Sequence, residues 1–361
     1  MPTSHETEER TEPGNHSGAP RRLAPVTVIV PAYNEAATIE ATLRSLRSQT
    51  LPPQRVIVVD DCSDDDTGEV ARRCGATVLR PLRNTGSKAG AQNVALPLVE
   101  TQFTIAIDAD TTLAPDAIEK VLAAFDRENV AAACGFVLPQ RVRSLWERGR
   151  YLEYMFAFSF AKPVQDFYGK PLISSGCFSA YRTDVLRDLG GWSTRTMAED
   201  MDLTWTLYQR GYEVRFVPEA VSYPLEPQDA TFMRKQLTRW SHGFIQNVRL
   251  HWRQMLQLHY LRSMVAVAVW DSVVASLVML AVLPILAVTV SPFFLIGYLL
   301  DAPAILIPAL VTGVKRREVV RVLASYPSFL VLRAVNAFFM LRAMWREYVV
   351  GRTLLVYEKG H

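Results

Sequence analysis

The carboxylates best suited to acid–base chemistry open a predicted helix in the second half of the chain. Glu199, Asp200 and Asp202 stand at the start of the helical pattern that continues through residue 207. A carboxylate can accept a proton from a hydroxyl group, including that of a sugar. Asp202 lies about 200° around a helix from Asp200, so we expect it to face away. Asp200 is therefore the better candidate for a general base, and Glu199 for a residue that orients the site.

A second group of side chains follows on a basic, amphipathic helix predicted over 230–254. Gln236, Arg239 and Trp240 place an amide, a guanidinium and an indole close together. A guanidinium can hold a diphosphate, and the face of an indole can stack on a sugar ring. Taken singly, these groups would also suit an ordinary helix N-terminus and an ordinary amphipathic helix. Their combination just ahead of an apolar segment indicates sugar chemistry at a membrane surface.

A third group follows a predicted strand at 103–107. Asp108 and Asp110 supply two hard oxygen ligands at its end, and such ligands suit Mg²⁺ or Mn²⁺. A divalent ion is what a diphosphate leaving group needs, although an isolated Asp-x-Asp pair is weak evidence. Lys88 lies in the Gly-containing turn 84–93 at a predicted helix N-terminus, a position that favours phosphate. The turn lacks the Gly-Lys-Ser/Thr order of a Walker loop.

The elements that must position these groups alternate between strands and helices. Strands are predicted at 26–30, 55–59, 76–79 and 103–107, and the first helix at about 36–48. This alternation predicts a parallel, right-handed βαβ sheet. Ligands bind such sheets at the carboxyl ends of the strands, where the turns 31–35 and 60–65 also lie.

Several motifs occur together in a fixed order. They are Val-Pro-Ala-Tyr-Asn-Glu at 30–35, Val-Val-Asp-Asp-Cys-Ser-Asp at 58–64, Lys-Ala-Gly-Ala-Gln-Asn at 88–93, Asp-Ala-Asp at 108–110, Ala-Glu-Asp at 198–200 and Gln-x-x-Arg-Trp at 236–240. With these motifs the chain resembles a family-2 inverting glycosyltransferase of the A-type fold. It resembles most the membrane-associated branch that includes cellulose, hyaluronan and poly-N-acetylglucosamine synthases. The resemblance implies an α/β fold, with an A-type domain built on a mostly parallel sheet and followed by C-terminal membrane helices.

The resemblance also implies a role for each matching residue. Nucleotide-sugar binding falls to Pro31, Tyr33, Glu35, Asp61, Lys88 and Asp108, with Tyr33 and Asp61 on the base. Asp110, together with Asp108, would bind the Mg²⁺ or Mn²⁺ ion, and Asp200, with Glu199 beside it, would be the general base. The residues that would border the donor diphosphate and the acceptor sugar are Gln236, Arg239 and Trp240. The Ala-Glu-Asp tripeptide replaces the commoner Thr-Glu-Asp, a loss of one hydroxyl that we do not expect to alter the chemistry.

Composition predicts the domain organisation. We expect a disordered tail at 1–24, a cytosolic glycosyltransferase domain at 25–260 with an interfacial helix near 230–254, a membrane region at 264–345 and a C-terminal tail at 346–361. Crossings are predicted at about 272–290 and 293–314, which keeps Arg262 and the basic cluster 315–317 on the cytosolic side. The apolar stretch 326–345 contains Arg333 and Arg342. It suits an interfacial or partly inserted helix, with a third crossing as the alternative.

Charge and cysteine content narrow the class of protein further. A formal net charge of +3 is too small to indicate nucleic acid as a partner. The four cysteines show no metal-like spacing, and no signal peptide opens the chain. We therefore expect the four cysteines to be reduced thiols in a protein that faces the cytosol.

These observations lead to one main functional expectation and two alternatives. We expect a multi-pass protein of the cell membrane that moves a sugar by inversion from a UDP-linked donor to a lipid, lipid-linked or polysaccharide acceptor. The first alternative is a processive synthase that exports its polymer; so few crossings would line such a channel thinly unless a homo-oligomer or an export partner completed it. The second is an inactive nucleotide-binding scaffold, against which the intact Asp108, Asp110, Asp200 and Arg239 argue. The identity of the donor sugar stays open.

Overall fold

The computed structural model describes residues 22–300 and 302–354. Most of the predicted tail 1–24 lies outside this part of the chain, as does the end of the predicted tail 346–361. Ala24 already belongs to the first strand and is fully buried.

One sheet of eight strands forms the centre of the catalytic domain. Its strands are β1 (Ala24–Ala32), β2 (Pro53–Asp60), β3 (Thr77–Leu79), β4 (Phe103–Ile107), β5 (Thr112–Leu113), β6 (Val130–Val137), β7 (Phe178–Arg182) and β8 (Glu213–Tyr223), in the order β3-β2-β1-β4-β7-β6-β8-β5. The four predicted strands are confirmed, and they pair in parallel. The sheet as a whole is mixed, because β7 runs antiparallel to both of its neighbours, β4 and β6. The βαβ alternation predicts only the parallel half.

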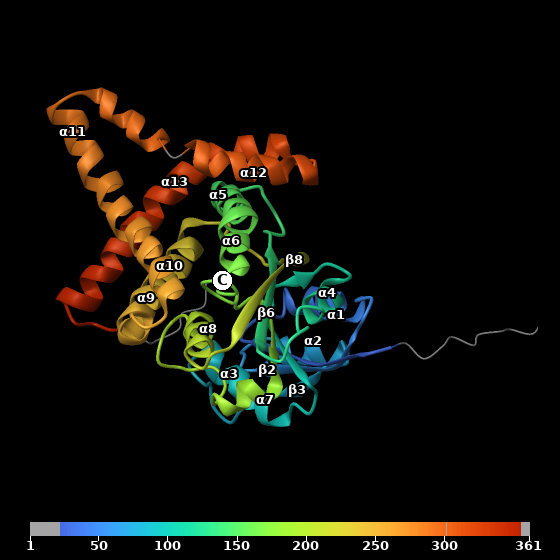
Figure 1. The fold of residues 1–361 in the computed structure, drawn as a ribbon. Coiled ribbons are helices and arrows are strands. Elements are labelled where there is room, and N and C mark those ends of the chain that lie inside the picture. The colour runs from blue at the N-terminus through green and yellow to red at the C-terminus, as the bar shows by residue number, and fades with distance from the viewer. Residues whose placement is uncertain (1–21, 301, 355–361) are drawn as a thin grey trace, which may run out of the picture.

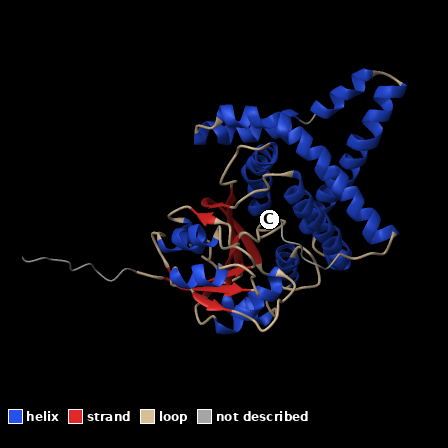
Figure 2. Ribbon diagram, turned by 180° about the vertical axis from the view of Figure 1, so that it is seen from behind, coloured by secondary structure: helices blue, strands red, loops and turns tan. Residues whose placement is uncertain are grey.

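Helices cover both faces of this sheet (Figures 1 and 2). The helices are α1 (Ile39–Arg47), α2 (Thr67–Arg73), α3 (Lys88–Ala95), α4 (Ala117–Leu122), α5 (Leu145–Phe156), α6 (Lys162–Phe167), α7 (Thr183–Asp188), α8 (Glu199–Gln209), α9 (Ala230–Met255), α10 (His259–Val269), α11 (Leu283–Thr289), α12 (Ala302–Arg316) and α13 (Val319–Met344). The side chains of α1, α2 and α4 share one apolar core with the sheet, and those of α3, α7 and α8 share another. The central strands β1 and β4 are mostly apolar and almost wholly buried because both of their faces are covered.

The C-terminal helices form a separate layer. Three of them are long and apolar enough to cross a membrane: Arg262–Thr289, Pro292–Arg316 and Val319–Val349. They contain the predicted stretches 293–314 and 326–345 and all but the last residue of 272–290, and they support a membrane location. In Figure 1 the helical segments on either side of α11 extend away from the catalytic domain. The second span then returns to it, because α12 lies beside α5, and its Ile305 and Ala309 share an apolar cluster with Leu152 of α5.

The third helix packs along the catalytic domain rather than away from it. Within the most apolar window of each span, 33% of the residues of the third are buried, against 11% and 12% in the other two. Its start is held by Tyr151, whose hydroxyl donates to Glu318 at 2.9 Å, and its end by His242, whose Nδ1 lies 2.7 Å from Glu347. Both ends of α13 are therefore held by helices that precede the C-terminal layer, α5 and α9.

Candidate active site

Lys88 links the segments that meet at the carboxyl edge of the sheet. It is the first residue of α3, whose N-cap Ser87 accepts a hydrogen bond from the Gly90 N–H at 3.0 Å. The Lys88 Nζ lies 2.5 Å from the Asp108 carboxylate and 3.7 Å from that of Glu199. Burial alone lowers the pKa of Lys88, but these two carboxylates outweigh it and raise the pKa, so the amine stays charged.

Asp200 is held beside this lysine by backbone donors. Its Oδ2 accepts from the Gly176 N–H at 2.7 Å and its Oδ1 from the Met201 N–H at 2.8 Å, while the Gly176 carbonyl accepts from Lys88 at 2.8 Å. A Cβ on Gly176 would stand 2.7 Å from Asp200 Oδ2 and 3.1 Å from Lys88 Nζ, so only glycine fits between them. Burial raises the pKa of Asp200, against the opposing effects of Lys88 and the two N–H donors. This environment suits a carboxylate that takes up a proton.

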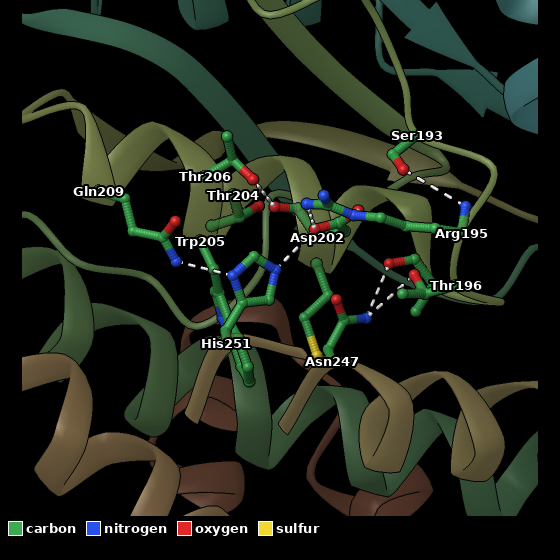
Figure 3. A network of polar contacts seen from close by, with 12 residues as sticks. Ser193, Arg195, Thr196, Asp202, Thr204, Trp205, Thr206, Gln209, Asn247 and His251 are labelled. Carbon is green, nitrogen blue, oxygen red and sulfur yellow. Dashed lines mark hydrogen bonds and ion pairs between the residues drawn. The ribbon is translucent and has the colours of Figure 1, made fainter. Parts of the chain in front are cut away.

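Asp202 faces away from this centre, as the helical spacing predicts. Figure 3 shows its carboxylate enclosed by Arg195 and His251. The Arg195 guanidinium donates twice, at 2.7 and 2.8 Å, and His251 Nε2 lies 2.6 Å away. Burial would raise the pKa of Asp202, but these hydrogen bonds outweigh it and leave the pKa below its ordinary value. Asp202 therefore joins α8 to α9 and does not reach the proposed base.

The Asp108–Asp110 pair stands in an acidic region. Burial raises the pKa of Asp110, and the negative charges of Asp108, Glu35 and Glu226 raise it further. A concentration of carboxylate oxygens of this kind fits a hard divalent cation. No cluster of three or more His, Cys, Asp or Glu side chains suited to a metal ion occurs among the described residues. Two carboxylates fit the way Mg²⁺ is usually held, by one or two protein ligands together with substrate phosphates.

The loops that follow β1 and β2 hold each other in place. The Asn34 N–H donates to Ser63 Oγ at 3.0 Å, and Asn34 Oδ1 accepts from the Asp64 N–H at 2.7 Å. Pro31 near the end of β1 and Tyr33 and Glu35 in the loop after it are half-buried. These contacts bring the predicted nucleotide-binding residues to one edge of the sheet.

Asp61 is buried against the neighbouring loop. Its Oδ1 accepts from the Thr85 N–H and its Oδ2 from the Thr85 hydroxyl, both at 2.8 Å. Asp61 thus positions the turn that carries Lys88, which is a structural task in addition to the predicted contact with a base.

The structure brings Gln236 and Trp240 together on one side of α9, as their spacing predicts. The Gln236 Oε1 accepts from Arg150 at 2.9 Å, and its amide lies 3.4 Å from Glu226. Trp240 is 38% exposed, with the Arg150 guanidinium 4.4 Å from its ring centroid. The charge of Arg239 lowers the pKa of Glu199, although burial is the larger effect and leaves that pKa raised. The Gln-x-x-Arg-Trp segment therefore borders the carboxylates at the start of α8.

Close packing fixes α9 against the segment that precedes these carboxylates. A Cβ on Gly243 would stand 2.6 Å from the Ala198 Cβ, and the Asn247 amide donates to the Ala198 carbonyl at 3.1 Å. The Met197 N–H donates to Gln246 at 2.9 Å. The small side chain of Ala198 thus packs against the backbone of α9.

The sequence patterns do not predict three residues of this site: Gly176, Gly243 and Arg150. Gly176 stands in a loop whose Ser-Ser-Gly sequence signals only a turn, and Gly243 lies within a helix. Arg150 lies in α5 next to aromatic residues such as Tyr151 and Tyr154 and outside every motif named above. No local pattern shows which segment each of them meets.

Comparisons with known proteins agree with this geometry. Residues 24–243 match the family described as "Glycosyltransferase like family 2". The poly-beta-1,6-N-acetyl-D-glucosamine synthase of Staphylococcus epidermidis is 26% identical over 222 residues, which cover 60% of this chain and 54% of that protein. The synthase of the same name from Staphylococcus aureus is 26% identical over 225 residues, covering 61% and 55%. The chain spans about half the length of these curated relatives.

A solved structure shares the fold over nearly the whole chain. The mannosyltransferase PcManGT from Pyrobaculum calidifontis, in complex with GDP-Man and Mn²⁺, matches with a TM-score of 0.60 and 21% identity, covering 94% of this chain and 92% of that one. This likeness supports the A-type fold expected from the sequence. The family match covers most of the chain, and the chain belongs to glycosyltransferase family 2.

Proposed function

We propose that the chain is a membrane-bound inverting glycosyltransferase. It moves a hexose from a UDP-linked donor to a membrane-associated lipid, lipid-linked or polysaccharide acceptor. The observation that carries the proposal is the arrangement around Lys88, in which one buried amine contacts Asp108 and the Gly176 loop that holds Asp200. A donor-side carboxylate and a proton-accepting carboxylate thereby lie on either side of a fixed positive charge.

Asp200 is the proposed general base. Each of its carboxylate oxygens accepts one backbone hydrogen bond and keeps a further acceptor site. It can therefore take the proton of an acceptor hydroxyl while that oxygen attacks the anomeric carbon in line. Glu199 orients the site through its contact with Lys88 at 3.7 Å. Inversion needs this single displacement and no second, nucleophilic carboxylate.

On the donor side we propose that Pro31, Tyr33, Glu35 and Asp61 line the nucleotide, and that Lys88 and Arg239 face the diphosphate. Asp110 and Asp108 would hold Mg²⁺ or Mn²⁺, which when bound neutralises the charge that develops on the leaving diphosphate. Lys88 keeps Asp108 oriented through its 2.5 Å contact. Trp240, part of whose side chain is exposed, would offer a stacking surface to the acceptor sugar.

We propose a topology in which the spans Arg262–Thr289 and Pro292–Arg316 cross the cell membrane and α13 lies along the cytosolic catalytic domain. Support comes from the contacts at both ends of α13, to Tyr151 and to His242, which would place both ends on one side of the membrane. A protease added outside spheroplasts should then cleave a tag placed after residue 354 only once the spheroplasts are lysed. Cleavage in intact spheroplasts would instead place α13 across the membrane.

Transfer to a lipid and processive synthesis differ in their products. The Staphylococcus relatives are named as polymer synthases, whereas the two proposed membrane crossings are too few to enclose a polymer without further subunits. Membranes containing the protein should be incubated with a panel of radiolabelled nucleotide sugars. Label extracted by organic solvent identifies a lipid product, and label in a water-soluble polymer identifies synthesis. No transfer from any donor would refute the proposed activity and leave the scaffold alternative.

A further inference from the structure

We propose that Arg150 is a positioning residue for the acceptor side of the site, because its guanidinium fixes the Trp240 indole and the Gln236 amide together. The inference rests on the proposed transfer to an acceptor at Trp240. Arg150 lies in α5, outside every motif of the family resemblance, and is separated from Gln236 by 86 residues of sequence.

A single planar group makes both contacts. The Arg150 side chain is 1% exposed, its Cζ lies 4.4 Å from the centroid of the Trp240 ring, and its Nη2 donates to Gln236 Oε1 at 2.9 Å. Gln236 and Trp240 stand one turn apart on α9, so they share a helix face. A guanidinium over an indole is attracted by cation–π forces, most strongly where water is excluded.

Two acids, the buried Glu226 and the partly exposed Glu153, keep the guanidinium in this orientation. Arg150 Nη1 donates to Glu153, and its Nε lies 3.9 Å from Glu226. Each acid is held in turn: Glu226 accepts from the Tyr154 hydroxyl at 2.8 Å, and Glu153 accepts from the Asn336 amide of α13 at 2.9 Å. Rotation of the guanidinium would leave a charge buried and unpaired, which is strongly unfavourable.

This arrangement has a consequence for acceptor binding. The guanidinium covers one face of Trp240, so a sugar can stack only on the other face. Because the plane of the guanidinium is fixed, the plane of the indole is set before the acceptor arrives, and less ordering remains to be done on binding. Lysine could supply the charge but neither the flat stacking surface nor the forked donors.

The test compares Arg150→Lys with Arg182→Lys. Arg182 is a matched control because its guanidinium also lies over aromatic rings, 5.6 Å from that of Phe125, and donates to backbone carbonyls, but it stands at the far end of β7. Transfer is measured with radiolabelled UDP-N-acetylglucosamine, and with whichever labelled nucleotide sugar the wild type uses if it does not use this one. The acceptor probe is a total lipid and glycan extract of the expressing membranes, added in increasing amounts.

Arg150→Lys should raise the amount of extract needed for half-maximal transfer about tenfold, within the range of a buried cation–π contact. The donor KM should change less than about twofold, and Arg182→Lys should change neither quantity. In a Trp240→Leu background, Arg150→Lys should add almost nothing, since coupled residues are not additive. Equal increases in the donor and acceptor requirements, or full additivity with Trp240→Leu, would overturn the proposal.

A spectroscopic measurement separates this proposal from the proposed activity. The protein is labelled with 5-fluorotryptophan, and the Trp240 signal among the seven tryptophans is assigned by its loss in Trp240→Phe. That ¹⁹F signal should move in Arg150→Lys and stay in place in Arg182→Lys, even if the wild type transfers no sugar from any donor. An unmoved Trp240 signal would overturn the positioning role.

Should Arg150→Lys fail to fold, Asn336→Leu provides a milder variant. It removes the hydrogen bond to Glu153 together with Asn336 Oδ1, a buried atom that has no hydrogen-bond partner in the described part of the chain. The same shift in acceptor requirement is expected at a smaller size, about threefold, because Arg150 keeps its own contacts. An unchanged acceptor requirement together with an unmoved Trp240 ¹⁹F signal would contradict the role assigned to Arg150.

Discussion

Two clusters of the catalytic domain each place one cation between two carboxylates, but the two cations differ in how far they are exposed to solvent. Lys88 stands between the carboxylates of Asp108 and Glu199, and Arg150 between those of Glu153 and Glu226. The Lys88 side chain is 15% exposed and that of Arg150 only 1%, while one acid of each pair, Asp108 and Glu153, is partly exposed.

The difference follows from the elements that surround each cation. Lys88 lies where strand ends and helix starts meet, so a substrate can replace its protein partners. Arg150 is enclosed by α5, α9 and α13, so it can only hold its neighbours in place. A buried cation between two acids can therefore serve in chemistry or in positioning, and its access to substrate separates the two.

The largest effect should come from removing the divalent ion. The acidic region around Asp110 holds more negative charge than Lys88 and Arg239 could neutralise once a diphosphate is added. Excess chelator or Asp110→Ala should bring sugar transfer to background, and Mg²⁺ or Mn²⁺ should restore the chelated wild type but not the variant. Full activity in chelator would show that the Lys88 cluster works without a metal.

Asp200→Asn tests the proton acceptor of the same cluster. The amide keeps the shape but cannot take the proton, so turnover should fall by about 10²–10⁴-fold with donor binding nearly unchanged. Asp202→Asn is the matched control two residues away and should retain most turnover in the folded protein. If the two variants lose turnover equally, Asp200 is not the base and Glu199 must be tested.

Gly176→Ala tests how tightly the Lys88 cluster is built. A methyl group 2.7 Å from Asp200 Oδ2 must displace that carboxylate, and a shift of about 1 Å can cost about 10²-fold in rate. Gly68→Ala is a suitable control, because its Cβ would crowd a carboxylate equally closely, at 2.6 Å from Asp60. Asp60 pairs with Arg80 and is not part of the Lys88 cluster. Turnover of both variants should be compared at equal thermal stability. Similar losses in both would mean that Gly176 matters only for folding.

The smallest effect concerns stability rather than turnover. The pKa of Asp202 is lower in the folded than in the unfolded chain, so its contribution is present above the unfolded value of about 3.9 and is lost as pH falls through the folded value. Asp202→Asn should lower the free energy of unfolding at neutral pH by about 1–3 kcal/mol. It should also flatten the fall of stability below about pH 4. Unfolding in detergent at a series of pH values measures both, and an unchanged pH dependence would exclude Asp202 as the group responsible.

Local patterns in the sequence are enough to predict the family, the parallel half of the sheet and the segments that carry most of the proposed site residues. The ends of strands can be predicted because apolar runs such as 103–107 stop at polar turns. The period of a helix predicts that Asp200 and Asp202 lie on different faces. The membrane location is readable for a similar reason, since an uncharged run long enough to cross a bilayer is a local property.

Which distant segments share a cluster becomes visible only in the folded chain. The antiparallel β7 places Gly176 between Lys88 and Asp200, although nothing near Gly176 signals either partner. Arg150 reaches α9 only because α5 packs beside it, and the course of α13 depends on contacts at both of its ends. These features depend on pairings between segments far apart in the chain, and neither periodicity nor a motif encodes such pairings.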